Sequence, residues 1–228
     1  MQQNTEKTET GTSLMGRGSF LKYTGTAVVA STLLVQGCKK DDDDKKSVDL
    51  GSGDIGVLNY AYALEQLEAA FYTQVVSTPY SGITAAESQL MLEIKQHELI
   101  HRDFLKAALG ANAIQNLEVD FSSIDFNSRA SVLGAAKAFE DLGVAAYNGA
   151  GQLLQSADYL LLAGKIVSVE ARHAAAIRSL LSPLSASFSG DDVVNVKGLD
   201  GASSPPSVLT TASVYIKTKI NASNLPTS

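Results

Sequence analysis

The chain has one cysteine, three histidines and no tryptophan among its 228 residues. A single cysteine excludes an intramolecular disulfide framework and any cysteine-rich zinc or iron–sulfur site. Basic residues are also few: 18 Lys and Arg stand against 24 Asp and Glu, so the formal net charge is −6. That balance argues against a nucleic-acid partner, which needs a basic face. With three histidines, carboxylates must supply most ligands of any metal site.

Several sequence motifs of common enzyme classes are absent as well. The sequence contains no P-loop, no Gly-rich dinucleotide fingerprint and no serine-centred nucleophile motif. What it does contain is 45% hydrophobic residues. This is a globular composition, and the length suits one ordinary domain with extensions.

Residues 1–37 are typical of a bacterial export signal. A basic segment at 17–22 precedes an apolar run at 23–35, which is too short to span a bilayer, and Cys38 follows. Residues 34–38 resemble a lipobox, in which cleavage exposes a cysteine that is then acylated. Residues 17–22 resemble a degenerate twin-arginine motif, with Gly18 in place of the second arginine. The alternative is a buried apolar helix that contains a core cysteine.

We therefore expect an exported protein whose lipid anchor at Cys38 holds it on a membrane of the bacterial cell envelope, in the periplasm or on the outer-membrane surface. Residues 38–53 would be the acylated cysteine and a charged tether, because blocks of like charge repel each other and stay extended. The run at 41–45 also resembles an enteropeptidase tag, so an engineered scar is the alternative for that stretch.

Residues 54–183 are predicted to form an all-α four-helix bundle. Apolar residues recur at helical spacing over 55–77, 84–109, from 128 or 129 to about 154, and over 156–181. Asp54 and Thr84 are the expected N-caps of the first two helices. The connection at 111–127 is too long for a short bundle loop and predicts a long crossover between helices 2 and 3. In the C-terminal extension, residues 184–228, a short fifth helix is expected over 206–220.

The two halves of the bundle repeat each other. Glu65 is followed by a tyrosine seven residues later, Tyr72, and Glu140 is followed in the same way by Tyr147. The second and fourth helices each carry a Glu-x-x-His motif. Residues three apart lie on one face of a helix, so each motif can direct both side chains to one place. The sequence predicts a doubled helical hairpin.

The repeated carboxylates lie among apolar residues on faces that should point into the core. Four carboxylates buried without partners would be very costly, and two divalent metal ions would compensate them. One Glu from each of two helices plus a Glu-x-x-His motif from each of the other two is a known dimetal pattern. The predicted ligands are Glu65, Glu98, His101, Glu140, Glu170 and His173. The alternative is a metal-free bundle whose carboxylates pair with Lys, Arg and His, with Lys137 neutralising Glu140.

Four further residues lie near this set. Glu68 is one turn from Glu65, but its counterpart in the third helix is Gly143, so we expect it beside the ligands or on an entry path. His97 is four residues before His101 and could hydrogen-bond near the site or replace a ligand, and we expect it to support a ligand or to be structural. Tyr72 and Tyr147 either orient ligand carboxylates by hydrogen bonds or fill the core.

At these residues the chain resembles ferritin-like domain proteins, in particular the secreted bacterial and fungal group labelled desiccation-related. The segments 64–72, 139–147 and 170–173 carry the resemblance, which covers roughly residues 52–183. It implies a ferritin-like fold and a ligand set at the six positions given above.

Two functions follow from this resemblance and the ligand chemistry. The first is redox chemistry at two Fe ions, or alternatively two Mn ions, with dioxygen or peroxide as substrate, in protection against oxidative stress. The second is a non-catalytic envelope protein that sequesters metal or has a structural role under stress or desiccation. Enzyme activity, ferroxidase-like or peroxide-scavenging, and a homo-oligomer both remain open.

Overall fold

The computed structural model describes residues 47–227. The expected signal peptide at 1–37, the lipidation site Cys38 and most of the tether lie outside the described residues. Within the described part, no helix is both long enough and apolar enough to cross a membrane.

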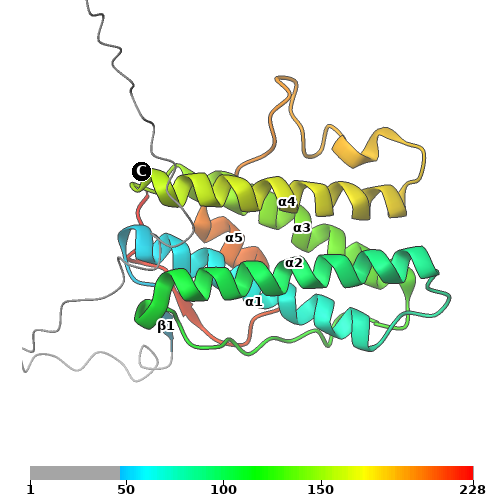
Figure 1. Cartoon of the computed structure of the whole chain (residues 1–228), viewed down its shortest axis with the longest axis horizontal. Coiled ribbons are helices and arrows are strands. Elements are labelled where there is room, and N and C mark those ends of the chain that lie inside the picture. Colours follow the sequence, from blue (N-terminus) through cyan, green and yellow to red (C-terminus); the bar gives the residue numbers. More distant parts are fainter. Residues whose placement is uncertain (1–46, 228) are drawn as a thin grey trace, which may run out of the picture. The chain divides into compact units, whose positions relative to one another are not determined.

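Four long helices form the body of the protein, as the sequence predicts (Figure 1). Helix α1 pairs with α2 and α3 pairs with α4, and the two hairpins meet through α1 and α3. Helix α1 is buried along most of its length, whereas α2 buries only a narrow stripe. The predicted all-α bundle is therefore confirmed. The bounds are α1 Gly53–Ser77, α2 Ala85–Leu109, α3 Arg129–Gly151 and α4 Ala157–Leu181.

The start of α2 follows the sequence prediction, but the start of α1 does not. Thr84 forms a capping box with Glu87: the Thr84 hydroxyl accepts from the Glu87 amide, and the Glu87 carboxylate accepts from the Thr84 amide. The N-cap of α1 is Ser52, not Asp54. Asp54 lies in the first turn, and its carboxylate accepts hydrogen bonds from the backbone amides of Gln155 and Ser156. Asp54 thus ties α1 to the connection between α3 and α4.

The crossover between α2 and α3 begins after a short helix, η3 (Gly110–Asn112), and runs beside α1. Side-chain amides on α1 satisfy its backbone: Asn59 donates to the Asn112 carbonyl and accepts from the Ile114 amide, and Gln66 accepts from the Leu117 amide. Because buried backbone groups need partners, these amides fix the path of the crossover.

The C-terminal extension differs from the prediction in two ways. Helix α5 spans Pro205–Ala212, so it is shorter than expected. The chain beyond it is held extended instead, because the Tyr215 carbonyl accepts from the Asp120 amide and the Lys217 amide donates to the Glu118 carbonyl. Two short strands were not predicted: β1 (Val48–Asp49) pairs in parallel with β2 (Ile220–Asn221). They are two residues long and carry no alternating pattern to detect.

Between α4 and α5 the extension, which includes the short helix η4 (Ala186–Ser189), returns across the bundle. A Cβ atom on Gly149 of α3 would lie 1.8 Å from the Ser203 carbonyl oxygen, so the backbone packs directly on this glycine. The guanidinium of Arg178 on α4 donates to Asp141 of α3 and to Asp192 of the extension. These hydrogen bonds hold the part of the extension around Asp192 against α3 and α4.

Candidate metal centre

All six predicted ligand residues lie together in the middle of the bundle. Each long helix contributes at least one of them, and the four carboxylates are fully buried at 0% exposure. The two histidines are buried as well, His101 at 9% and His173 at 5%. By helix, the residues are Glu65 on α1, Glu98 and His101 on α2, Glu140 on α3, and Glu170 and His173 on α4.

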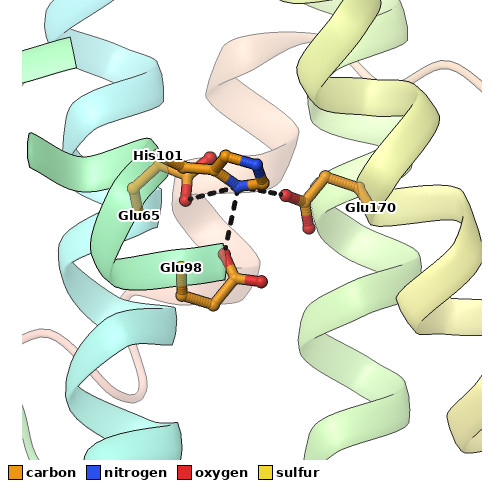
Figure 2. A group of neighbouring side chains, drawn as sticks. All are labelled: Glu65, Glu98, His101 and Glu170. Atoms are coloured by element: carbon orange, nitrogen blue, oxygen red, sulfur yellow. Dashed lines mark ion pairs between the residues drawn. The ribbon is translucent and has the colours of Figure 1, made fainter. Parts of the chain in front are cut away.

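One half of the centre surrounds His101. Its Nδ1 atom lies 2.8 Å from Glu170 Oε1 and 3.6 Å from both Glu65 Oε2 and Glu98 Oε2. Figure 2 shows these carboxylates converging on the imidazole from α1, α2 and α4. The donor atoms of these four residues lie within 4.8 Å of one another, so they can hold one metal ion.

The other half surrounds His173. Its Nδ1 atom lies 2.8 Å from Glu98 Oε1, 3.4 Å from Glu140 Oε2 and 3.7 Å from Glu170 Oε2. These donor atoms form a second group within the same 4.8 Å limit. Glu98 and Glu170 belong to both groups, and each presents one oxygen to each histidine. Glu98 and Glu170 are therefore the two carboxylates shared by both halves, and each would contact both ions of a dimetal centre.

Two tyrosine hydroxyls hold the remaining carboxylates. Tyr147 on α3 donates to Glu65 Oε1 at 2.5 Å, and Tyr72 on α1 donates to Glu140 Oε1 at 2.5 Å. Of the two roles left open by the sequence, orientation of carboxylates is the one supported by these contacts. Each of these two glutamates keeps its Oε2 atom directed at a histidine.

The buried oxygen and nitrogen atoms that are not bonded to the tyrosines show whether the centre suits metal ions. Among the described residues, no regular hydrogen bond is made by either carboxylate oxygen of Glu98 and Glu170, by Oε2 of Glu65 and Glu140, or by Nδ1 of the two histidines. The close polar contacts of these atoms are the ion pairs that they form with one another. Buried polar atoms are rarely left without partners. Two histidine nitrogens, two single carboxylate oxygens and two shared carboxylates make a donor set that suits two ions. The residues present therefore fit a dimetal centre.

The electrostatics of the centre favour positive charge at the same place. Burial raises the pKa of Glu65 well above its ordinary value, and Glu170 raises it further. Burial likewise raises the pKa of Glu140 to about 8. Burial alone would lower the pKa of His101 and His173, but their carboxylate neighbours raise both to about 12. The carboxyl groups resist losing their protons and the histidines retain theirs, so the centre favours positive charge, which a cation can supply.

Glu68 supplies a fifth carboxylate at the edge of this cluster. A Cβ atom on Gly143 would lie 3.1 Å from Glu68 Oε1 and 3.7 Å from Glu170 Oε2, so the missing side chain makes room for both carboxylates. Burial raises the pKa of Glu68 well above its ordinary value, and the charge of Glu170 adds to the shift. Glu68 is not part of either donor group, and its role stays a prediction.

His97 supports one half of the centre only. Its Nδ1 atom lies 2.9 Å from His173 Nε2, and the two rings stack at a centroid distance of 5.1 Å. This contact uses the nitrogen of His173 that faces away from the carboxylates. Lys137, the candidate partner of Glu140, instead lies 3.8 Å from Asp141 and 3.5 Å from Asp192.

One buried tyrosine of α1 was not singled out from the sequence. Tyr60 on α1 is 1% exposed, and its hydroxyl has no hydrogen-bond partner among the described residues. The only signal in the sequence was its position five residues before Glu65, where a tyrosine usually fills the core.

Fold and site together define a class of protein: a helical bundle with a buried cluster of glutamates and histidines that can hold metal ions. The sequence profile of one family, described as a ferritin-like domain, matches residues 53–183. The chain belongs to this ferritin-like family. No curated protein matches the sequence.

Proposed function

We propose that this protein binds two iron ions in its bundle and reacts with dioxygen or peroxide in the bacterial envelope, as a protection against oxidative stress. The observation that carries the proposal is the convergence of four buried glutamates and two buried histidines in two groups of possible ligand atoms, which share Glu98 and Glu170. Manganese suits the same mixture of carboxylate and imidazole ligands. Iron is the metal we propose, because Fe(II) can give an electron to dioxygen.

Two Fe(II) ions would supply two electrons, one each, which with two protons reduce dioxygen to hydrogen peroxide or peroxide to water. The protein's own residues perform the other tasks. Glu98 and Glu170 would each contact both ions, and Tyr72 and Tyr147 keep the other two carboxylates in place. The buried surroundings exclude bulk water from the centre.

Metal content tests the site itself. The purified chain, loaded anaerobically with Fe(II) and desalted, should retain about two ions per chain. The double variant Glu98→Gln/Glu170→Gln removes both bridging carboxylates without changing their size and should retain fewer than one. Glu93→Gln is the matched control, because Glu93 is an exposed glutamate on the same helix that bonds to Gln89. Equal retention by parent and double variant would refute the assignment.

Oxidant consumption tests the activity. The loaded protein should consume dioxygen or peroxide, with the change in iron absorbance followed by stopped-flow spectroscopy. Tight metal binding without consumption of either oxidant would overturn the redox proposal. It would leave metal sequestration, the non-catalytic alternative, as the function of the centre.

The location in the envelope rests on residues 34–38 of the sequence alone. We infer that Cys38 is acylated after cleavage of residues 1–37. Cells that express the chain should incorporate radiolabelled palmitate into it, and the Cys38→Ala variant should not. Labelling of the variant, or an unlabelled parent, would refute the lipid anchor.

A further inference from the structure

An apolar pocket adjoins the metal centre. It lies among all four long helices, and its cavity volume is about 30 Å³. Three of its lining residues are one helical turn from ligands: Ala61 from Glu65, Leu105 from His101, and Ile166 from Glu170. Tyr147 also lines it, and the hydroxyl of Tyr147 donates to Glu65. Tyr147 therefore contacts both the pocket and a predicted metal ligand.

The outer part of the pocket lies between α2 and α4. Phe104 on α2 and Leu162 and Ala163 on α4 line it and are half-buried. The floor is formed by fully packed residues of α1 and α3, such as Leu64 and Ala146. A small molecule could pass from the α2–α4 face to a point one turn from the ligands.

The lining of the pocket is almost wholly apolar, and this limits what it can hold. Tyr147 uses its hydroxyl on Glu65. Two further tyrosines line the pocket: Tyr60, whose hydroxyl has no partner among the described residues, and Tyr159, which is half-buried on α4. A guest molecule therefore meets at most two available hydroxyls. A buried water needs two to four polar partners. Hydrogen peroxide has two O–H groups to satisfy and meets the same shortage. Both molecules would lose hydrogen bonds on entry.

Size excludes most other apolar molecules. An engineered cavity of about 150 Å³ takes benzene, and this pocket is several times smaller. An alkyl chain or aromatic ring would need the helices to separate. A diatomic apolar gas fits the volume, needs no hydrogen bonds, and can accept a weak one from Tyr60.

We propose that this pocket binds dioxygen and delivers it to the metal centre, so that dioxygen rather than peroxide is the oxidant that enters here. This inference rests on the proposed redox function but makes a separate claim about the pocket. It assigns the pocket residues Ala61, Ala163 and Ile166 to oxidant access, a role they do not share with the ligands.

The first experiment uses the metal-free full chain, so that it does not depend on the redox activity. Dissolved dioxygen is paramagnetic and speeds the relaxation of nearby protons. Under dioxygen pressure, the methyl groups of Ala61 and Ile166 should relax faster than those of Ala135 and Ile216, which are as little exposed, at 8% and 7%, but do not line the pocket. The variant Ala163→Phe should remove the difference, because Ala163 is half-buried in the outer part of the pocket and the larger side chain would cover its opening.

The second experiment measures rates in the iron-loaded protein. Ala163→Phe should slow the reaction with dioxygen by about tenfold, which corresponds to a barrier higher by about 1.4 kcal/mol. Its reaction with peroxide should be unchanged. Ala175→Phe, also on α4 but outside the pocket, is the matched control and should leave both rates unchanged. Ala163→Leu is the smaller substitution to use if the phenylalanine prevents folding.

The outcomes separate the two proposals. Equal relaxation of pocket and control methyl groups would overturn the pocket as a dioxygen site, whatever the loaded protein does. Selective relaxation with an unchanged dioxygen rate in Ala163→Phe would overturn the delivery role. Selective relaxation in a protein that consumes neither oxidant would overturn the redox function and delivery together, and would leave a gas-binding pocket without a reaction.

Discussion

The hydroxyl of Tyr147 on α3 donates a 2.5 Å hydrogen bond to Glu65 on α1, and Tyr72 on α1 donates an equally short bond to Glu140 on α3. The repeated spacing in the sequence joins each glutamate to a tyrosine seven residues later on its own helix. The bonds instead cross between helices, from each half to the other. The two tyrosines thus connect the hairpins by hydrogen bonds at the candidate metal centre, and they orient the carboxylates of Glu65 and Glu140.

Loss of one tyrosine hydroxyl should weaken metal binding without removing the site. Tyr147→Phe leaves Glu65 Oε1 buried without its donor, so Glu65 can rotate away from His101. Removal of a hydrogen bond behind a ligand lowers metal affinity by about 10- to 100-fold, and competition with a fluorescent chelator would measure it. Tyr72→Phe should have a similar effect through Glu140. Tyr215→Phe, whose ring packs on Phe139, is the control; an equal loss in that variant would contradict the assigned role.

The contact between His97 and His173 predicts that the two metal positions are unequal. His97→Val removes the 2.9 Å contact to His173 Nε2 and puts into α2 the residue type that α4 has at the corresponding position, Val169. The affinity of one ion should fall by about tenfold, because the orientation of one ligand is lost. The other ion should bind as before. A stepwise Fe(II) or Mn(II) titration by calorimetry distinguishes the two steps, and equal weakening of both would refute the prediction.

The close approach at Gly149 predicts a large effect of one methyl group. Gly149→Ala would place a Cβ atom 1.8 Å from the Ser203 carbonyl oxygen, so the extension must move off α3. Overpacking of this kind costs about 1–3 kcal/mol of unfolding free energy, measured by urea denaturation. Gly134→Ala on the exposed face of the same helix meets no atom within 4 Å and should stabilise the protein by about 0.5–1 kcal/mol. Equal effects of the two substitutions would contradict the packing.

The capping box of α2 predicts a pH-dependent contribution to stability. The Thr84 amide and the Arg129 guanidinium, which lies 2.6 Å from Glu87, hold the pKa of Glu87 below its ordinary value of 4.5. A carboxylate with a lowered pKa stabilises the fold above its unfolded pKa, and this stability is lost as the pH falls through the folded pKa.

The test compares the parent with Glu87→Gln over a range of pH. At pH 7 the variant should be less stable by about 1 kcal/mol, because its amide oxygen can still accept from the Thr84 amide, but the hydrogen bond from Arg129 loses its charged acceptor. The difference should be constant down to the ordinary glutamate pKa of 4.5 and should shrink below it. A difference that grows as the pH falls would refute the assignment.

The local parts of this account could be predicted from the sequence. Apolar periodicity placed the four long helices, and the spacing in Glu98-x-x-His101 and Glu170-x-x-His173 put each pair on one face, because both patterns depend only on helix geometry. The errors lie where two segments meet. Asp54 was expected to cap its own helix but bonds to residues 155 and 156, and α5 was expected to continue beyond Ala212, where pairing with the crossover holds the backbone extended.

The sequence by itself determined the kind of bundle and the residues on its inner faces, since helical periodicity is a property of each segment alone. Only the tertiary structure decided how those residues meet. It made Glu98 and Glu170 the shared carboxylates, joined Tyr147 to Glu65 across the helices, and left an apolar pocket beside them. These relationships depend on the axial position and the rotation of each helix relative to its neighbours. Both are determined by the packing of the whole core.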